Sequence, residues 1–146
     1  SENENLDELY DAFGIRPTLF LYSNYGLAVF NNEKEIINIV PNVNIIEKLS
    51  YNGIIVTAPG ESVDFVSRFF APKLGIQEDP VTGGAHCELI PYWYQRLKKQ
   101  DMIAKQLSER GGVIHCSYLG DRVNIGGEAT TYMQGELLLD IKKLPT

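Results

Sequence analysis

The chain is poor in the residues that would cross-link it or carry it into a membrane. Only two of its 146 residues are cysteines, and two cysteines without secretory cues favour free thiols in a reducing compartment such as the cytoplasm. No apolar run is long enough to span a bilayer, and the start carries no signal-peptide pattern. These absences predict a cytoplasmic globular protein that does not bind membranes.

Positive charge is also scarce. Lysine and arginine number 13 against 19 acidic residues, which gives a net charge of −6. This balance argues against a nucleic-acid backbone or an anionic membrane as the main partner. It does not exclude a small anion that backbone amides hold locally. The chain also lacks an initiator methionine, so we expect a processed or truncated product.

The two histidines each precede a cysteine, in His86-Cys87 and His115-Cys116. Four such residues suggest zinc, but the spacing is unfavourable. Neighbouring side chains on a strand point to opposite faces, and neighbours on a helix diverge by about 100°. Dinucleotide and P-loop glycine patterns are also absent. The sequence therefore predicts no metal and no cofactor.

The hydrophobic content of 44% is ordinary for a soluble domain of this length. We predict a short tail over residues 1–5 and a single domain over residues 6–146. Apolar spacing predicts helices over residues 6–13, 33–40 and 43–49. It predicts strands over residues 18–22, 27–30, 53–58 and 63–70. Four further strands, over residues 101–107, 113–118, 122–125 and 129–139, are separated by glycine turns and predict an antiparallel meander.

The stretch from Glu78 to Cys87 reads as a loop that turns into a helix with an apolar and aromatic body. Free amides and the positive dipole end make the start of a helix an anion site, and glycines there allow close approach. Gly83 and Gly84 would then hold a carboxylate, and Asp79 would relay a proton or fix a polar substituent. The alternative is that Asp79 only caps the helix.

Arg68 ends a predicted strand close to this loop. It could pair with Asp79 or with a ligand, although a surface arginine is the simpler interpretation. Cys87 and Glu88 follow on the same helix. A reactive thiol or an acid there is less favoured than a free cysteine and a polar stripe.

Several motifs occur along the chain in the same order as in a known protein family. Arg68-Phe69-Phe70-Ala71-Pro72 and the stretch from Glu78 to Cys87 resemble the phenazine-biosynthesis-like (PhzF-like) isomerase family. Further matches follow at Pro91-Tyr92-Trp93, Gln106-Leu107-Ser108, Arg110-Gly111-Gly112, Gly120-Asp121-Arg122-Val123 and Gly135-Glu136-Leu137. The likeness runs from about Gly14 to Leu138.

The resemblance implies an α+β fold of the diaminopimelate-epimerase type. Such proteins have two lobes, each a mixed, barrel-like β-sheet wrapped around a central apolar helix, with the active site between them. This chain resembles the second lobe only. The acid/base glutamate and a further histidine belong to the first lobe.

The resemblance also assigns residues. It places Asp79 at the substrate and the carboxylate on the helix amides of Gly83 and Gly84, with Thr82 and Ala85 beside them. His86 is a further candidate on the same helix. The family usually has serine where this chain has Gly84, so a hydroxyl is missing.

Two functions follow as expectations. The first is one lobe of a cofactor-independent isomerase or epimerase, which is inactive without the first-lobe glutamate. The second is a non-enzymatic module that binds a small carboxylate or serves in assembly. Because a lone lobe would expose its cleft-facing surface, we also expect a homodimer or association with the missing lobe.

Overall fold

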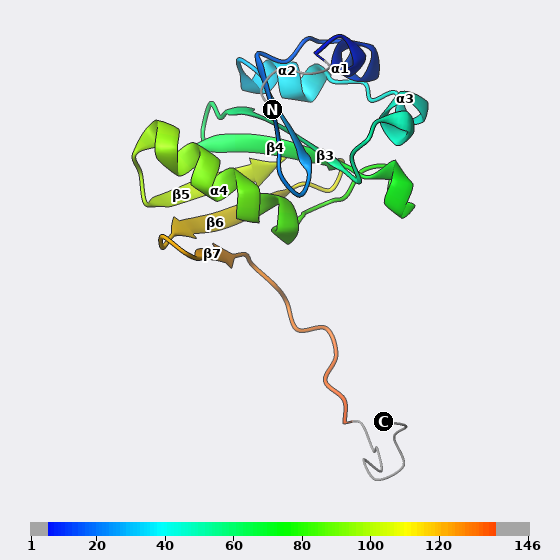
Figure 1. Ribbon diagram of the computed structural model, residues 1–146. Helices are drawn as coiled ribbons and strands as arrows, with labels where there is room; N and C mark the ends of the chain where they lie inside the picture. The colour runs from blue at the N-terminus through cyan, green and yellow to red at the C-terminus, as the bar shows by residue number, and fades with distance from the viewer. Residues whose placement is uncertain (1–5, 137–146) are drawn as a thin grey trace.

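A seven-stranded sheet forms the middle layer of the computed structural model, which describes residues 6–136 (Figure 1). The strands lie side by side in chain order. Their bounds are β1 (Leu19–Tyr22), β2 (Gly26–Val29), β3 (Ile54–Pro59), β4 (Phe65–Phe70), β5 (Asp101–Gln106), β6 (Gly112–Tyr118) and β7 (Val123–Gly126). Only β2 with β3 and β4 with β5 pair in parallel; the other neighbours are antiparallel.

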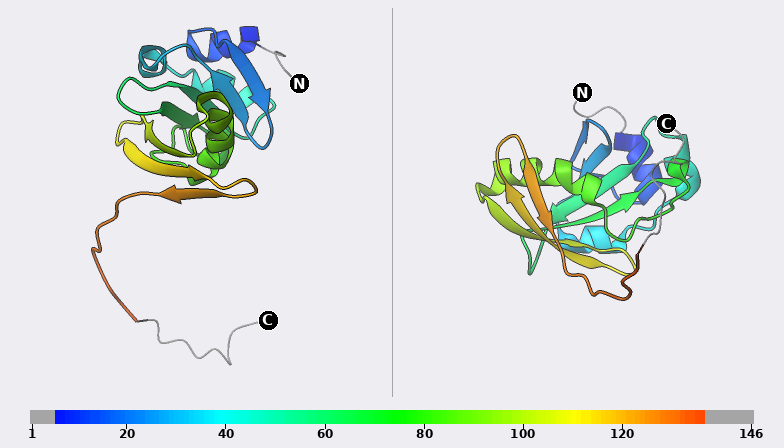
Figure 2. Two further views of the ribbon diagram at one scale, coloured as in Figure 1. Left: turned by 90° about the vertical axis from the view of Figure 1, so that its left-hand side faces the viewer. Right: turned by 90° about the horizontal axis from the view of Figure 1, so that it is seen from below.

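The two parallel pairs explain where the helices lie, because parallel neighbours need a crossover connection. The crossover from β2 to β3 contains α2 (Glu33–Asn38) and α3 (Val43–Lys48), which pack with α1 (Leu6–Phe13) on one face. The crossover from β4 to β5 contains the short 3₁₀ turn η1 (Pro72–Leu74) and then α4 (Gly83–Leu97) on the other face. Figure 2 shows the sheet curving around α4.

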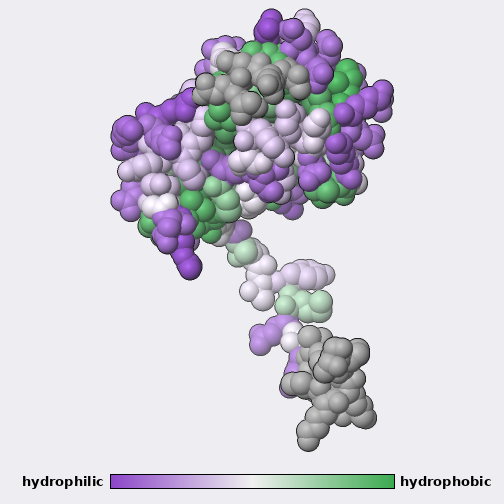
Figure 3. Space-filling view, in the orientation of Figure 1, coloured by the Kyte–Doolittle hydropathy of each residue, from purple (hydrophilic) through white to green (hydrophobic). Residues whose placement is uncertain are grey.

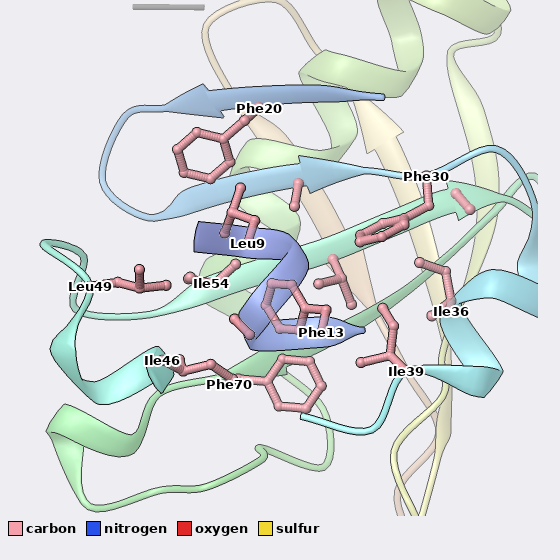
Figure 4. Packing of buried hydrophobic residues seen from close by; sticks show 14 of the residues in the cluster. Leu9, Phe13, Phe20, Phe30, Ile36, Ile39, Ile46, Leu49, Ile54 and Phe70 are labelled. Atoms are coloured by element: carbon pink, nitrogen blue, oxygen red, sulfur yellow. The ribbon is translucent and has the colours of Figure 1, made fainter. Parts of the chain in front are cut away.

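Two apolar clusters fill the spaces on either side of the sheet. The first lies under α1, α2 and α3, where Phe13, Phe30 and Phe70 pack with Leu9 and Ile36 (Figure 4). The second lies under α4 and takes side chains from all seven strands. Burial of this area is the main stabilising contribution to the fold, at about 25 cal/mol per Å².

α4 is also held by polar contacts. The Trp93 indole donates to the Thr57 hydroxyl over 3.0 Å and stacks on Phe65 with ring centroids 5.6 Å apart. The Thr57 hydroxyl donates in turn to the Val66 carbonyl over 2.7 Å. The buried indole and hydroxyl are therefore both satisfied, and they fix α4 on the sheet.

Most predicted elements form within a few residues of their expected bounds. α1 ends as expected at Gly14, which has φ of +71° and donates to the Tyr10 carbonyl over 2.7 Å. The strand expected at 63–70 forms as β4, but its expected half-burial is wrong: every residue of β4 is buried except Arg68, because helices cover both faces. The expected cover on both faces of β3 is confirmed.

The sheet is open, since β1 and β7 do not pair. The fold is α+β, with a mixed sheet that carries α4 on one face. The expected barrel-like sheet wrapped around a central helix is not confirmed. None of the helices within residues 6–136 is long and apolar enough to cross a bilayer. The expected tail at 1–5 lies outside the described residues.

The strand expected over residues 129–139 does not form over its described part, 129–136. This part is exposed and leaves the body of the molecule as an arm (Figure 3). Tyr132 is 97% exposed and Met133 80%. A strand without a neighbour satisfies none of its backbone groups, so β propensity alone does not order it. Residues 137–139 lie outside the described part of the chain.

Candidate functional site

The first turn of α4 is left without a cap. Thr82 is the N-cap residue, yet its side chain makes no capping hydrogen bond. The amides of Gly83, Gly84 and Ala85 have no acceptor among residues 6–136, whereas the His86 amide donates to the Thr82 carbonyl over 3.3 Å. We call Thr82–Ala85 the helix mouth. Its free amides and the helix dipole suit an anion.

The space in front of these amides is open. Gly83 and Gly84 are exposed, and a Cβ at Gly83 would meet nothing within 4 Å. A Cβ at Gly84 would meet only Tyr25, whose hydroxyl would lie 3.5 Å away. Ala85 has a buried side chain and offers only its backbone. A ligand can therefore reach the backbone at both glycines.

Tyr25 is a neighbour of the helix mouth that the sequence did not indicate. Its amide donates to the Glu88 carboxylate over 3.1 Å, and its ring packs edge-on against Phe69 with centroids 4.9 Å apart. These contacts bring the β1–β2 turn to α4. Because Tyr25 is remote from Gly84 in the sequence, no local pattern could have revealed the pairing.

Asp79 lies beside the helix mouth and its backbone is fixed on both sides. Its amide donates to the Phe69 carbonyl over 3.0 Å, and its carbonyl accepts from Gln106 Nε2 over 2.7 Å. The Thr82 hydroxyl donates a short hydrogen bond to Asp79 Oδ2. The Thr82 side chain thus bonds to Asp79 and does not cap the helix amides. The Thr82 amide donates to Gln106 Oε1 over 2.8 Å, so it is not available to a ligand.

The segment that follows β5 braces the loop before α4. The Ser108 hydroxyl donates to the Pro80 carbonyl over 2.7 Å and accepts from the Gly111 amide over 3.0 Å. Gly111 has φ of +68°, which favours glycine. A Cβ at Gly112 would lie 2.5 Å from the Val81 Cγ2 methyl, so a side chain there would force Val81 to move. The motifs at 106–108 and 110–112 therefore hold the Asp79 loop in place.

Arg68 does not pair with Asp79. Its side chain is 11% exposed and forms two bonds to the Glu78 carboxylate, over 2.7 and 3.0 Å. It also donates to the carbonyls of Ile36 and Ile39 over 3.2 and 2.8 Å. Arg68 therefore pairs with Glu78 instead of Asp79, and the simpler interpretation as a surface arginine is wrong because the side chain is largely buried. Contact between Arg68 and a ligand stays a prediction. Within the structure, Arg68 holds the Asp79 loop to α2.

His86 is fully buried under the first turn of α4. Nδ1 lies 2.7 Å from the Thr82 carbonyl, which can only accept, so Nδ1 carries the proton. Burial lowers the pKa of His86, and the bond to Thr82 opposes this only in part. The neutral ring therefore supports the Thr82 carbonyl from inside and does not face a ligand at the open side.

The two His-Cys pairs are split by the fold. His86 is buried and Cys87 exposed, while His115 is exposed and Cys116 buried. Burial raises the pKa of the Cys116 thiol to about 12. Within residues 6–136 no three His, Cys, Asp or Glu side chains gather where they could hold a metal ion.

Two hollows open beside the braced loop. One of about 450 Å³ is lined by Glu78, Pro80, Ser108, Glu109 and Arg110. A second of about 830 Å³ lies between Val81, Arg110 and the ends of β6 and β7. Neither is lined by Asp79, Gly83 or Gly84. These two hollows therefore lie beside the helix mouth and do not contain it.

Comparisons with known proteins show the family of the chain. Residues 23–135 match the family model for phenazine biosynthesis-like proteins. The chain belongs to the phenazine biosynthesis-like family. An uncharacterized isomerase of Pseudomonas aeruginosa is 45% identical over 140 residues, which are 95% of this chain and 54% of the relative. An uncharacterized isomerase of Halalkalibacterium halodurans is 40% identical over 94% of this chain and 53% of its own length.

A solved structure also matches this chain over about half of its own length. A PhzF-family protein of Enterococcus faecalis superposes with a TM-score of 0.87 at 41% identity, over 95% of this chain and 54% of its own. The chain spans about half the length of the curated relatives it matches. Membership of the phenazine biosynthesis-like family and its α+β fold are thus established, and the two curated relatives are named as uncharacterized isomerases.

Proposed function

We propose that this chain is one lobe of a cofactor-independent isomerase or epimerase. Its helix mouth holds the carboxylate of a small metabolite through the amides of Gly83, Gly84 and Ala85, and Asp79 exchanges a proton with a nearby carbon. The observation that carries the proposal is the uncapped start of α4 with Asp79 braced beside it. Amides aimed at a carboxylate stabilise the negative charge that develops when a neighbouring C–H bond breaks.

The chain alone is expected to be inactive. Gly83 and Gly84 are exposed at the helix mouth, and proton transfer is most effective in a site that excludes water. The family resemblance assigns the acid/base glutamate to the other lobe. The second wall and the second proton-transferring group would then come from the half of the relatives that this chain does not match.

Reconstitution tests this proposal. The chain is combined with the first half of the Pseudomonas aeruginosa relative and incubated in D₂O with small 2-amino, 2-hydroxy and β,γ-unsaturated carboxylates. Deuterium should enter the carbon framework in the complex and not with either half alone. Asp79→Asn should abolish the exchange. The control Asp11→Asn changes an exposed aspartate on α1, across the sheet from α4, and should leave it intact. No exchange with any acid in the complex would contradict the proposal.

A carboxylate-binding module without catalysis is the alternative, and Gly84 favours it because the usual serine hydroxyl is missing. Calorimetric titration with small aromatic and amino carboxylates separates the two functions. Binding that is unchanged by Asp79→Ala, together with no proton exchange in the complex, would favour the module. Self-association of the chain also stays a prediction, which light scattering at high concentration can test.

A further inference from the structure

The side chain of His86 supplies the shorter of two hydrogen bonds that close the first turn of α4. The Thr82 carbonyl accepts from the His86 amide over 3.3 Å and from Nδ1 of the same residue over 2.7 Å. The backbone bond is longer than the usual N–H···O range of about 2.7 to 3.2 Å. The His86 ring therefore stabilises, from inside the protein, a turn that the Thr82 side chain does not cap.

The other ring nitrogen of His86 is a buried acceptor. Nδ1 carries the proton because the Thr82 carbonyl can only accept, so Nε2 of the neutral ring has a lone pair and no hydrogen. Burial lowers the pKa of His86, which favours this neutral form. Nε2 is shielded from solvent and has no hydrogen-bond partner within residues 6–136. Folded proteins rarely leave such a buried polar atom unpaired.

Ser67 is a second buried polar side chain without a partner, and it lies in the same layer of the molecule. Its Oγ is shielded from solvent and makes no hydrogen bond to any described residue. Ser67 pairs with Gln106 across β4 and β5, and the side chain of Gln106 reaches Thr82. Phe65, two residues earlier on the same face of β4, packs against His86 with ring centroids 6.1 Å apart. Ser67 therefore points from β4 towards the turn that carries His86.

The half of the relatives that this chain does not match cannot supply the partner that these two atoms lack. Both atoms are shielded from solvent by this chain itself, and another lobe would contact only its surface. The two side chains do not bond to each other either, since neither has a partner within residues 6–136. A small molecule between them has to donate to His86 Nε2 and accept from the Ser67 hydroxyl. Water does both, and a buried water needs about two to four such polar partners.

We propose that one buried water molecule lies between Ser67 and His86. It donates a proton to His86 Nε2 and accepts the proton of the Ser67 hydroxyl. The hydrogen bonds then run from Ser67 through the water to the ring, and from Nδ1 to the Thr82 carbonyl, so β4 is linked to the first turn of α4. The water also fixes the tautomer, because a donor at Nε2 requires the ring proton on Nδ1. This site goes beyond the proposed function, since it needs no catalysis by Asp79.

A crystal structure of the chain, at a resolution that shows ordered water, is the direct test. A single peak of density is expected about 2.7 to 3.2 Å from both Ser67 Oγ and His86 Nε2. Apolar side chains that fill the space between the two atoms would overturn the proposal. A direct hydrogen bond from Ser67 to His86 would overturn it as well.

The ring nitrogens of His86 give a second test in solution. In the ¹⁵N-labelled chain at about pH 7, Nδ1 should resonate as the protonated nitrogen and Nε2 as an acceptor that takes a hydrogen bond. Ser67→Ala removes one of the partners of the water and should shift the Nε2 signal towards that of a free acceptor. Ser50→Ala, at an exposed serine after α3 on the other face of the sheet, is the control and should leave it in place. A free-acceptor signal already present in the unmodified chain would refute the site, and this outcome can be read even if Ser67→Ala does not fold.

Discussion

Replacing Arg68 should be among the most destabilising changes near the site. Arg68→Met removes two bonds to Glu78 and two to the carbonyls of Ile36 and Ile39. Loss of one partner of a buried ion pair costs about 3 to 5 kcal/mol because the other charge stays unpaired. Glu78 is 23% exposed and regains some hydration, so we expect the lower end, about 3 kcal/mol.

Urea unfolding followed by circular dichroism measures this loss. With a slope of about 1 to 3 kcal/mol per M, the midpoint should fall by about 1 to 3 M. Arg16→Met is the matched control, because Arg16 pairs with Asp7 at the surface, where the side chains are 60% and 89% exposed. Such pairs contribute about 0 to 1 kcal/mol. Equal midpoints for the two variants would refute the structural role of Arg68.

Three other predictions concern residues at or under α4. Because burial lowers the pKa of His86 below 6.5, the neutral ring stabilises the fold above that pH, and this contribution is lost as the pH falls. The urea midpoint should therefore drop more between about pH 7 and about pH 5.5 in the unmodified chain than in His86→Gln; equal drops would contradict this. A thiol reagent should label Cys87 rapidly and Cys116, whose pKa is raised to about 12, only on unfolding; mass spectrometry would show a second fast site if this is wrong. Gly84→Ser should raise the free energy of unfolding by about 0.5 kcal/mol, since serine is the better helix former and its Cβ meets Tyr25 at an ordinary 3.5 Å; a fall in urea midpoint would refute the open geometry.

Local patterns predicted most of the fold. Apolar spacing and glycine stops gave α1 its bounds of Leu6–Phe13, and the continuous apolar run at β3 predicted cover on both faces. The same patterns cannot show which strands pair, so the two parallel neighbours were not foreseen. They also cannot show whether a strand finds a partner, which is why residues 129–136 were predicted as a strand.

For the candidate site too, local sequence indicated some residues, and others could be found only from the tertiary structure. The loop and helix from Glu78 to Cys87 were indicated by local chemistry, because acidic residues and glycines at a helix start suit an anion. The supporting residues Gln106, Ser108 and Tyr25 come from other strands and turns. Their roles depend on tertiary packing. The sequence suggested Asp79, a ligand or the solvent as the surroundings of Arg68, and only the fold shows that Glu78 is its partner.

The account depends most on carboxylate binding at the start of α4. In a ¹⁵N-labelled sample of the chain, sodium benzoate is titrated against sodium chloride at equal ionic strength. The amide signals of Gly83, Gly84 and Ala85 should move in a saturable way with benzoate and not with chloride, and more than any others in residues 6–136. If these three signals stay in place, or move no more than they do with chloride, the helix mouth is not a carboxylate site and the proposed function fails with it.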